Sequence, residues 1–224
     1  MQHQLQNRYD ELYRIVELVA KARYTAHRRL TFHSSFAQFS LTFLSIGLII
    51  IPLLDLGGFS AHYSPKYIQI MQIVFAVILL AYSLLLSMGR FEARAEKMLS
   101  CGIALSRILR QVKPLQGTSP PLPDPVYDEL YTRYYDILEK FENHTQADYH
   151  SVSTTLLARQ GIPVRGQQTR PEYVGQVMSY FWKITTRRAG VYFMWTIVYS
   201  HYFISVIAMY AWIFYMVYPS PVTR

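Results

Sequence analysis

The sequence predicts an all-α membrane protein, with a transmembrane helical hairpin that extends into cytoplasmic helices and a third, C-terminal transmembrane helix. Of the 224 residues, 51% are hydrophobic and only 16% are charged. A soluble domain carries about a quarter charged residues. Three long stretches, 34–54, 67–89 and 189–223, contain no Asp, Glu, Lys or Arg. Because about 20 apolar helical residues cross the hydrocarbon core of a bilayer, each stretch is long enough to span it.

We place the spans at about 36–54, 68–88 and 191–218. The first two are rich in Leu, Ile and Val, whereas the third has no Leu and many aromatic residues. An alternative for the third is a buried or interfacial helix that does not cross. The first span is not a signal peptide, because it begins after 35 residues that include many charges and no small-residue cleavage pattern follows it.

The distribution of Lys and Arg predicts the orientation in the membrane. Residues 1–35 carry six of these cations, the loop at 55–66 carries one, and residues 89–190 carry fourteen. By the positive-inside rule, the N-terminus and 89–190 lie in the cytoplasm, and the loop and the C-terminus lie outside. The net charge of +8 follows from this topology and does not by itself indicate nucleic-acid binding. The basic residues that we expect at anionic lipid headgroups are Arg28, Arg29, Arg90, Arg187 and Arg188.

The segments next to the first two spans read as helices that continue out of the membrane. Apolar residues recur at helical spacing in 8–33, and no Gly or Pro separates this segment from the first span. The second span likewise continues inward without a helix breaker, as far as about Val112. We expect the two apolar stripes to pack on each other as a stalk, with the single cysteine, Cys101, as a packed thiol.

A Pro-rich linker at 113–125 separates this stalk from further cytoplasmic helices. Asp124 is expected to be the N-cap of a helix that starts at Pro125 and continues to about Leu157. A loop and a helix at 171–188, which mixes aromatic rings with cations, follow. We therefore divide the chain into a core at 1–150, a loop with an interfacial helix at 151–190, and the third span with a short outer tail at 191–224.

The stretch "EKFENHTQADYH" (139–150) holds the densest group of chemically active side chains. On a helix, His144 and Asp148 would share a face. A zinc site needs three or four converging ligands, and this pair supplies two. The alternative is a polar helix face that hydrogen-bonds to neighbouring helices, which we favour. We therefore expect no catalytic residue, no metal and no cofactor, and the chain is not expected to be an enzyme.

Three segments, in this order, resemble the SMODS- and SLOG-associating two-transmembrane effector (SLATT) domain family. "RIVELVAKARYTAHRRL" leads into the first span, "GRFEARAEKMLSCGIALSRIL" leaves the second, and "YDELYTRYYDILEKFENHTQADY" follows the linker. Together they cover about residues 8–150. The additional helix and third span resemble the variant of the family that is found beside reverse transcriptases in bacterial defence loci.

The resemblance implies a function in antiviral defence at the bacterial inner membrane. The family is thought to form homo-oligomeric pores that disable an infected cell, by abortive infection, when a partner senses phage. Glu142, Asn143 and His144, with Asp148, would then belong to the cytoplasmic bundle that holds the pore closed or receives the trigger. The implied partners are the lipid bilayer, further copies of the chain, and a neighbouring sensor such as a reverse transcriptase or its nucleic-acid product. A nucleotide signal would also fit, but no motif supports it.

Two function classes remain open on the residues alone. In the first, the chain forms a pore, and weakly polar residues in the spans line it or else only pack helices together. These residues are Ser40, Ser45, Gln72, Ser83 and His201. In the second, the chain is a non-conducting membrane tether whose basic cytoplasmic helices recruit a protein or nucleic acid. The tyrosines at 127, 131, 134 and 135 would contribute to that surface, or else form part of a core.

Overall fold

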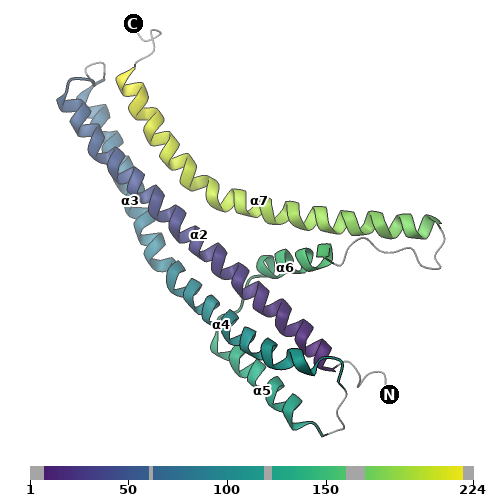
Figure 1. Cartoon of the computed structure of the whole chain (residues 1–224). Helices are drawn as coiled ribbons and strands as arrows, with labels where there is room; N and C mark the ends of the chain where they lie inside the picture. The colour runs from purple at the N-terminus through teal and green to yellow at the C-terminus, as the bar shows by residue number, and fades with distance from the viewer. Residues whose placement is uncertain (1–7, 61–62, 119–122, 160–169, 219–224) are drawn as a thin grey trace. The chain divides into compact units, whose positions relative to one another are not determined.

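A computed structural model of the chain describes residues 8–60, 63–118, 123–159 and 170–218, and this part contains helices and no strand (Figure 1). In chain order the elements are α2 (Arg8–Leu56), α3 (Pro65–Gly89), α4 (Phe91–Val112), the 3-10 helix η1 (Lys113–Leu115), α5 (Pro125–Lys140), α6 (Gln146–Arg159) and α7 (Arg170–Val217). The chain forms two compact units. The bundle unit comprises Met1–Leu30 and Glu92–Met194, and the span unit comprises Thr31–Phe91 and Trp195–Arg224.

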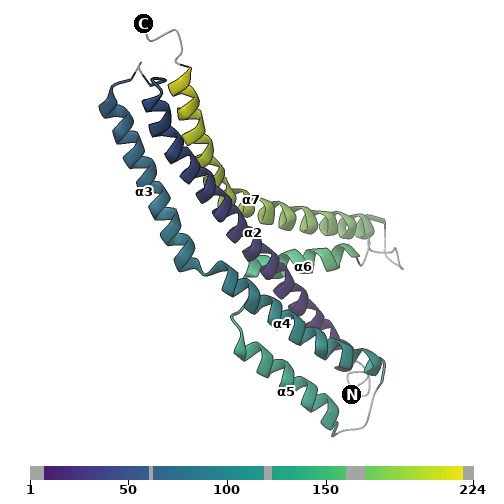
Figure 2. The same cartoon turned by 60° about the vertical axis from the view of Figure 1, so that its left-hand side comes forward.

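The span unit packs the second part of α2, α3 and the last part of α7 side by side (Figure 2). Each of these helices is long and apolar enough to cross a membrane, which confirms the predicted fold class. A Cβ atom added to Gly47 of α2 would lie 2.2 Å from Sδ of Met209, so this glycine lets α2 and α7 approach closely. The buried residues at the centre are Leu44, Ile51, Ile68, Phe75, Met209 and Ile213.

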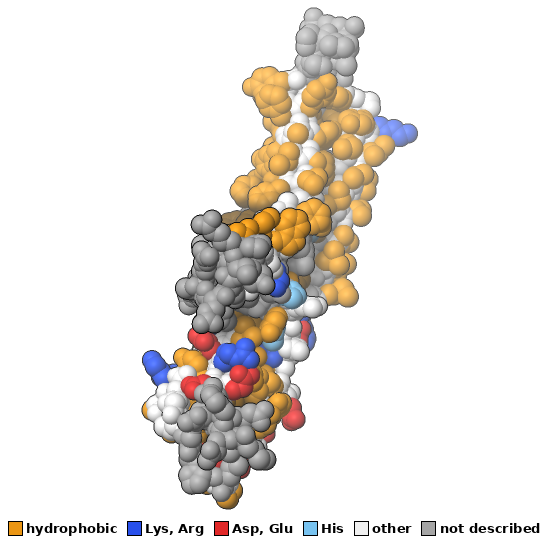
Figure 3. Space-filling model, turned by 90° about the vertical axis from the view of Figure 1, so that its right-hand side faces the viewer, with side chains coloured by type: hydrophobic (Ala, Val, Ile, Leu, Met, Phe, Trp, Pro, Cys, Tyr) orange, Lys and Arg blue, Asp and Glu red, His pale blue; other side chains and the backbone are white. Residues whose placement is uncertain are grey.

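The outer surface of the span unit is apolar. Large side chains project from all three helices, and Figure 3 shows hydrophobic atoms covering the visible face of these segments, whereas the acidic side chains gather elsewhere. An exposed apolar surface of this extent is unfavourable in water and favourable in lipid. Among the most exposed are Phe39, Ile49, Ile73, Leu85, Met88, Ile204 and Phe214.

The helix of the second span, α3, ends at Gly89, where the sequence predicts no break. Arg90 has φ 44° and ψ 38°, a left-handed conformation that separates α3 from α4. Gly89, just before it, has no room for a side chain, since an added Cβ would lie 2.3 Å from the ring of Phe91. The prediction of an uninterrupted helix is therefore wrong at Arg90, because hydrophobic periodicity does not detect a single left-handed residue.

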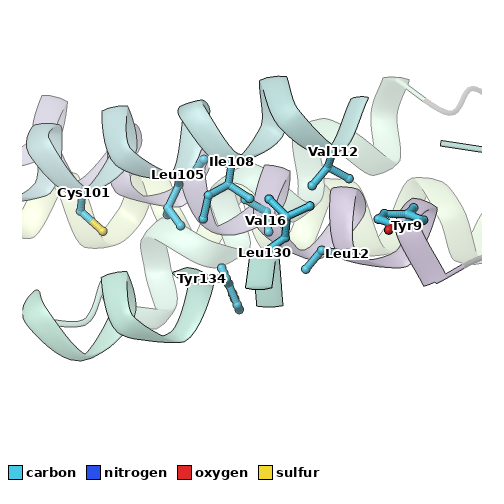
Figure 4. Packing of buried hydrophobic residues seen from close by; sticks show 10 residues of the cluster. Tyr9, Leu12, Val16, Cys101, Leu105, Ile108, Val112, Leu130 and Tyr134 are labelled. Atoms are coloured by element: carbon cyan, nitrogen blue, oxygen red, sulfur yellow. The ribbon is translucent and has the colours of Figure 1, made fainter. Parts of the chain in front are cut away.

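The core of the bundle unit joins α2, α4 and α5 (Figure 4). This packing confirms the predicted stalk between the first helix and the continuation of the second span. Cys101 is fully buried, as predicted, and burial raises the pKa of its thiol. Gly102 faces the ring of Tyr24, 3.1 Å from the position of an added Cβ. The buried cluster consists of Tyr9, Leu12, Val16, Ala20, Cys101, Leu105, Ile108, Val112, Leu130 and Tyr134.

The start of α5 is fixed to the start of α2 through one carboxylate. Asp124 is the N-cap of α5, as predicted, and accepts a hydrogen bond from the backbone N–H of Tyr127. Its side chain also accepts hydrogen bonds from Tyr9 Oη at 2.7 Å and from Arg8 Nη2 at 2.9 Å. Burial and the bond to Asp124 raise the pKa of Tyr9 to about 12. The Tyr9 hydroxyl, with the cap and Arg8, lowers the pKa of Asp124.

Two further expectations about helix boundaries are corrected. The predicted helix from Pro125 to about Leu157 is two helices, because α5 ends at Lys140 and residues 141–145 are not helical. Conversely, the predicted break between a helix at 171–188 and the third span is absent, since α7 is continuous. Gly190 lies inside α7 without interrupting it, because a single glycine only lowers helix stability by about 1 kcal/mol.

The left-handed residue at the end of α3 leads to a prediction for stability. Replacing Arg90 by Gly should raise the free energy of unfolding by about 1 kcal/mol, because Gly adopts this conformation without steric cost. Replacing it by Val should lower the free energy, because a branched Cβ is disfavoured there. Thermal unfolding of the purified protein in detergent, followed by circular dichroism, checks both. A Val variant as stable as the wild type would show that this position is not left-handed.

Candidate functional site

The stretch that the sequence singled out forms the connection between α5 and α6. Thr145 starts α6 as its N-cap, and Asp148 lies three positions later, as in a capping box. The Asp148 carboxylate accepts hydrogen bonds from the Thr145 hydroxyl at 2.6 Å and from the Thr145 backbone N–H at 3.2 Å. The backbone N–H of Asp148 in turn donates to the Thr145 hydroxyl at 3.4 Å. Asn143 Oδ1 accepts the N–H of His144 at 3.0 Å. These local bonds compete with a continuous helix and explain the break.

Three arginines from other helices hold this connection in place. Arg94 of α4 makes a two-pronged ion pair with Glu142, at 3.0 and 2.5 Å. Arg29 of α2 makes a second such pair with Asp148, at 3.0 and 3.1 Å. The third is Arg23 of α2, which donates to the backbone carbonyl of Glu142. Two parallel N–H···O bonds fix orientation as well as distance, so the connection is clamped to both stalk helices. We call this group the arginine clamp.

Arg23 is the buried member of the arginine clamp. Its side chain is 2% exposed, which is rare for a guanidinium. Besides the Glu142 carbonyl, it contacts Asn143 Oδ1 and Met98 Sδ, each at 3.5 Å. Its Nε is buried without a hydrogen-bond partner in the described part of the chain. A buried cation held only by neutral acceptors is costly, so the position of the connecting loop depends on keeping those acceptors in place.

The arginine clamp shifts the titration of its neighbours. Hydrogen bonding to Arg94 is the largest effect on Glu142 and lowers its pKa. Burial acts in the opposite direction, and the charges of Arg94, Lys97 and Arg23 lower the pKa further. Burial and then the charge of Arg23 lower the pKa of His144, although Asp148 acts in the opposite direction. His144 Nδ1 is buried and has no hydrogen-bond partner among the described residues. His144 is therefore a neutral, half-buried imidazole at neutral pH.

The structure brings the four predicted motif residues together, but not on a helix face. Glu142, Asn143 and His144 lie in the connecting loop, and only Asp148 is helical. Sequence reasoning also missed Arg23 and Arg94 as partners, which lie 119 and 48 positions away from Glu142 in the chain. One signal was available: Arg23 falls among the apolar positions of its helix, between Ala22 and Ala26, where a cation requires a buried partner.

The chemistry of the arginine clamp is electrostatic. Among the described residues, no group of three or more His, Cys, Asp or Glu side chains is placed to hold a metal ion. The Glu142 and Asp148 carboxylates are occupied by arginines, and no serine or cysteine of the described segments is hydrogen-bonded to His144. That the chain is not an enzyme stays a prediction. Breaking the two ion pairs would remove the charged links of the loop to α2 and α4 and leave the hydrogen bonds of Arg23 as its remaining side-chain link within the arginine clamp.

The basic residues assigned to the lipid headgroups occupy different environments. Arg28 is exposed and Arg29 is paired with Asp148. Arg90 is the left-handed residue at the end of α3. The side chains of Arg187 and Arg188 lie outside the described part of the structure. Their role at headgroups stays a prediction.

The weakly polar residues in the spans do not bond to one another. Ser40 is buried in the span unit and Ser45 donates to the backbone carbonyl of Leu41 at 2.8 Å. Gln72 is half-buried, whereas Ser83 and His201 are exposed. His201 instead contributes its ring and carbonyl to a polar contact between α3 and α7, and this contact is centred on the hydroxyls of Tyr82 and Ser205, 2.7 Å apart. No hydrogen bond joins any two of the five residues within the described part.

The pair between Arg29 and Asp148 should dominate the stability of the arginine clamp. Replacing Asp148 by Ala should lower the free energy of unfolding by about 3 kcal/mol, because it removes the two-pronged, partly buried ion pair with Arg29 together with the bonds to Thr145. Glu11→Ala, which removes an exposed pair with Arg14, should change it by less than about 0.5 kcal/mol. A double-mutant cycle with Arg29→Met, measured by denaturant unfolding in detergent, checks the coupling. Additive effects of the two substitutions would contradict the pairing.

His144 should make the bundle unit sensitive to acid. Since the folded-state pKa of His144 is depressed, the unfolded chain binds a proton first as the pH falls below the usual value of 6.5. Stability is therefore full above pH 6.5 and decreases as the pH falls through the folded-state pKa. Glu142, with its lowered pKa, adds a second loss of stability below 4.5. Thermal midpoints at pH 7.5 and 5.5 should differ less in His144→Asn than in the wild type, and equal differences would exclude His144.

Comparison with known proteins supports the reading of the segments and their order. No curated protein and no solved structure matches the chain. A protein family does match, over residues 5–217, which include every described helix. Its description as a two-transmembrane effector agrees with the helical hairpin of α2 and α3. The chain therefore belongs to the SMODS and SLOG-associating 2TM effector domain family 5.

Proposed function

We propose that this membrane effector of a defence system oligomerises into a pore that depolarises the bacterial inner membrane when a partner triggers it. Family membership supports the coarser part, a membrane effector in defence. We further propose that the partner is a neighbouring sensor, such as a reverse transcriptase or its nucleic-acid product, on the resemblance of the additional helix and third span alone. In the proposed orientation the N-terminus is cytoplasmic and the C-terminus is outside, following the distribution of cations.

The exposure of α3 carries this proposal. In the most apolar 18-residue stretch of this helix, only 6% is buried within the chain, compared with 22% for the corresponding stretch of α2. A spanning helix that buries so little of its surface within the chain must contact lipid or other copies with the rest. Three helices in one chain cannot enclose a water path, so a pore requires several copies. Along α3, weakly polar residues interrupt the apolar surface and offer a lining or a contact between copies: Gln69, Gln72, Ser83 and Ser87.

The arginine clamp is the proposed receiver of the trigger. It lies in the cytoplasmic part of the chain under the proposed topology, where a sensor would reach it. Glu142 and Asn143 are exposed, while Arg23 beneath them is buried. A partner that binds the loop would therefore compete for the same groups that keep Arg23 satisfied. Loss of these groups changes the packing between α2 and α4, and these helices continue toward the first two spans.

Membrane potential tests this function directly. The chain is expressed from a tight promoter with a voltage-sensitive dye, alone and with its genomic neighbour under phage challenge. Depolarisation before lysis, only with the neighbour and phage, is expected. Asp148→Ala, if still inserted in the membrane, should depolarise without the trigger, whereas Glu11→Ala should behave as the wild type. A steady membrane potential in every condition, in cells where the chain is correctly inserted, would contradict pore formation.

A second candidate function rests on the tyrosines of α5. Tyr134 is buried in the core, but Tyr131 and Tyr135 are 41% and 47% exposed. Tyr127 stacks on Tyr131 with ring centroids 5.8 Å apart, and Tyr131 contacts Tyr135 at 4.9 Å, so the rings form a ladder along the helix. Arg8 lies over Tyr127 at 5.1 Å. Such a ladder is suited to bind a partner protein or unpaired bases, as in a non-conducting recruitment module.

The ladder leads to a test that separates the two functions. Tyr131→Ala with Tyr135→Ala should abolish retention of the genomic neighbour in a pull-down if α5 recruits it, because both rings are removed. The matched control is Val126→Ala, an exposed apolar residue on the same helix. A partner retained by the unsubstituted chain, together with an unchanged membrane potential, favours the recruitment module. A lost partner together with lost depolarisation would place the ladder in the triggering of the pore.

A further inference from the structure

A small cleft lies between α2 and α6 in the bundle unit, next to the arginine clamp. Its volume is about 300 Å³, at the lower end of ligand-binding sites. The lining includes two cations and several hydroxyls, and it contains neither Asp nor Glu: Lys21, Tyr24, Thr25, Arg28, Ser151, Val152 and Thr155. We propose that this cleft binds a phosphate group carried by a small molecule or a lipid.

The sequence places these residues on facing sides of two helices. On α2 the lining positions 21, 24, 25 and 28 recur at helical spacing and share one face. On α6 the positions 151, 152 and 155 do the same. The wall from α6 is held close to α2 by the ion pair of Asp148 with Arg29, and Val152, one turn further, is 6% exposed. The cleft is therefore built by the same contact that closes the arginine clamp.

The available hydrogen-bond groups favour an anion. Arg28 is exposed and makes no hydrogen bond or ion pair with another described residue. The Ser151 hydroxyl likewise has no partner in the described part. The Lys21 ammonium forms an ion pair with Glu17 at 2.5 Å, but the Lys21 side chain remains 34% exposed. A guanidinium, an ammonium and a hydroxyl around one space match the oxygens and the double charge of a phosphate better than a single carboxylate.

The remaining lining indicates what can be attached to the phosphate. The Tyr24 hydroxyl is bonded to Ser106 at 3.1 Å, so Tyr24 offers its ring to the cleft rather than its polar end. Val152 adds an apolar surface. Thr25 and Thr155 donate to backbone carbonyls of their own helices, at 3.0 and 2.9 Å. A ring and an aliphatic side chain beside two cations suit a phosphomonoester with a compact body.

Two sources could supply this phosphate. Arg28 lies eight residues before Phe36 on the uninterrupted helix α2, about 12 Å along its axis, so the headgroup of an anionic lipid is one source. A soluble phosphomonoester such as a nucleotide is the other. The proposal goes beyond the proposed function and does not depend on pore formation, since it concerns binding alone.

Binding to the full-length protein in nanodiscs tests the proposal in two arms. In the soluble arm, discs of neutral phosphatidylcholine are titrated with inorganic phosphate and adenosine 5′-monophosphate by calorimetry, with adenosine as the phosphate-free control. In the lipid arm, discs containing some phosphatidic acid are analysed by native mass spectrometry for retained lipid. The variants are Arg28→Gln and Lys21→Gln. The matched control is Arg110→Gln, an exposed arginine outside the cleft with the same change of charge.

Each cleft variant should weaken phosphate binding about tenfold or more, since each removes a charged hydrogen-bond donor. Arg110→Gln should leave it unchanged. Loss in the soluble arm alone identifies a free phosphomonoester, and loss of retained phosphatidic acid alone identifies the lipid headgroup. No binding in either arm, or equal weakening by Arg110→Gln, overturns the proposal. Membrane potential is not measured here, so a failed pore and a failed cleft remain distinguishable.

Discussion

The guanidinium of Arg23 must be satisfied away from water, and the bundle unit is arranged to do so. The loop before α6 supplies the carbonyl of Glu142 and the amide of Asn143, which requires α5 to end early. Two exposed or half-buried ion pairs, made by Arg94 and Arg29, then hold that loop over the buried cation. The helix break and the capping box place these acceptors over the buried charge, and the pair of Arg29 with Asp148 also holds the wall of the cleft.

Much of the fold could be predicted because two solvents impose opposite demands on the sequence. In lipid, backbone groups must bond within the helix and side chains must be apolar, so α2 and α3 are visible as uncharged stretches. In the bundle unit, the apolar stripe and the N-cap at Asp124 are local signals and were also readable. Their order along the chain was sufficient to identify the family, which needs no knowledge of contacts.

The parts that sequence reasoning missed depend on contacts between distant residues or on one backbone angle. The break after Lys140 was missed although Asn143, Thr145 and Asp148 favour caps and turns, because the apolar spacing continues across it and the arginines that bind the loop lie on other helices. Arg90 was hidden because arginine rarely adopts positive φ. For the candidate site, the motif residues were found, but their role was assigned to a helix face instead of a clamped loop. At the loop, the tertiary bonds from Arg23, Arg29 and Arg94 act together with the local caps, and no pattern along the chain shows these partners.

The burial of Cys101 gives the chain a practical property. It is the only cysteine in the sequence, it has no exposed surface, and its thiolate is disfavoured. Thiol reagents react with the thiolate and need access to it, so the natural chain behaves as a cysteine-free background while it is folded. Single cysteines introduced at either side of a span would then report their own side of the membrane. The orientation of this effector can thus be mapped without first removing a residue from its core.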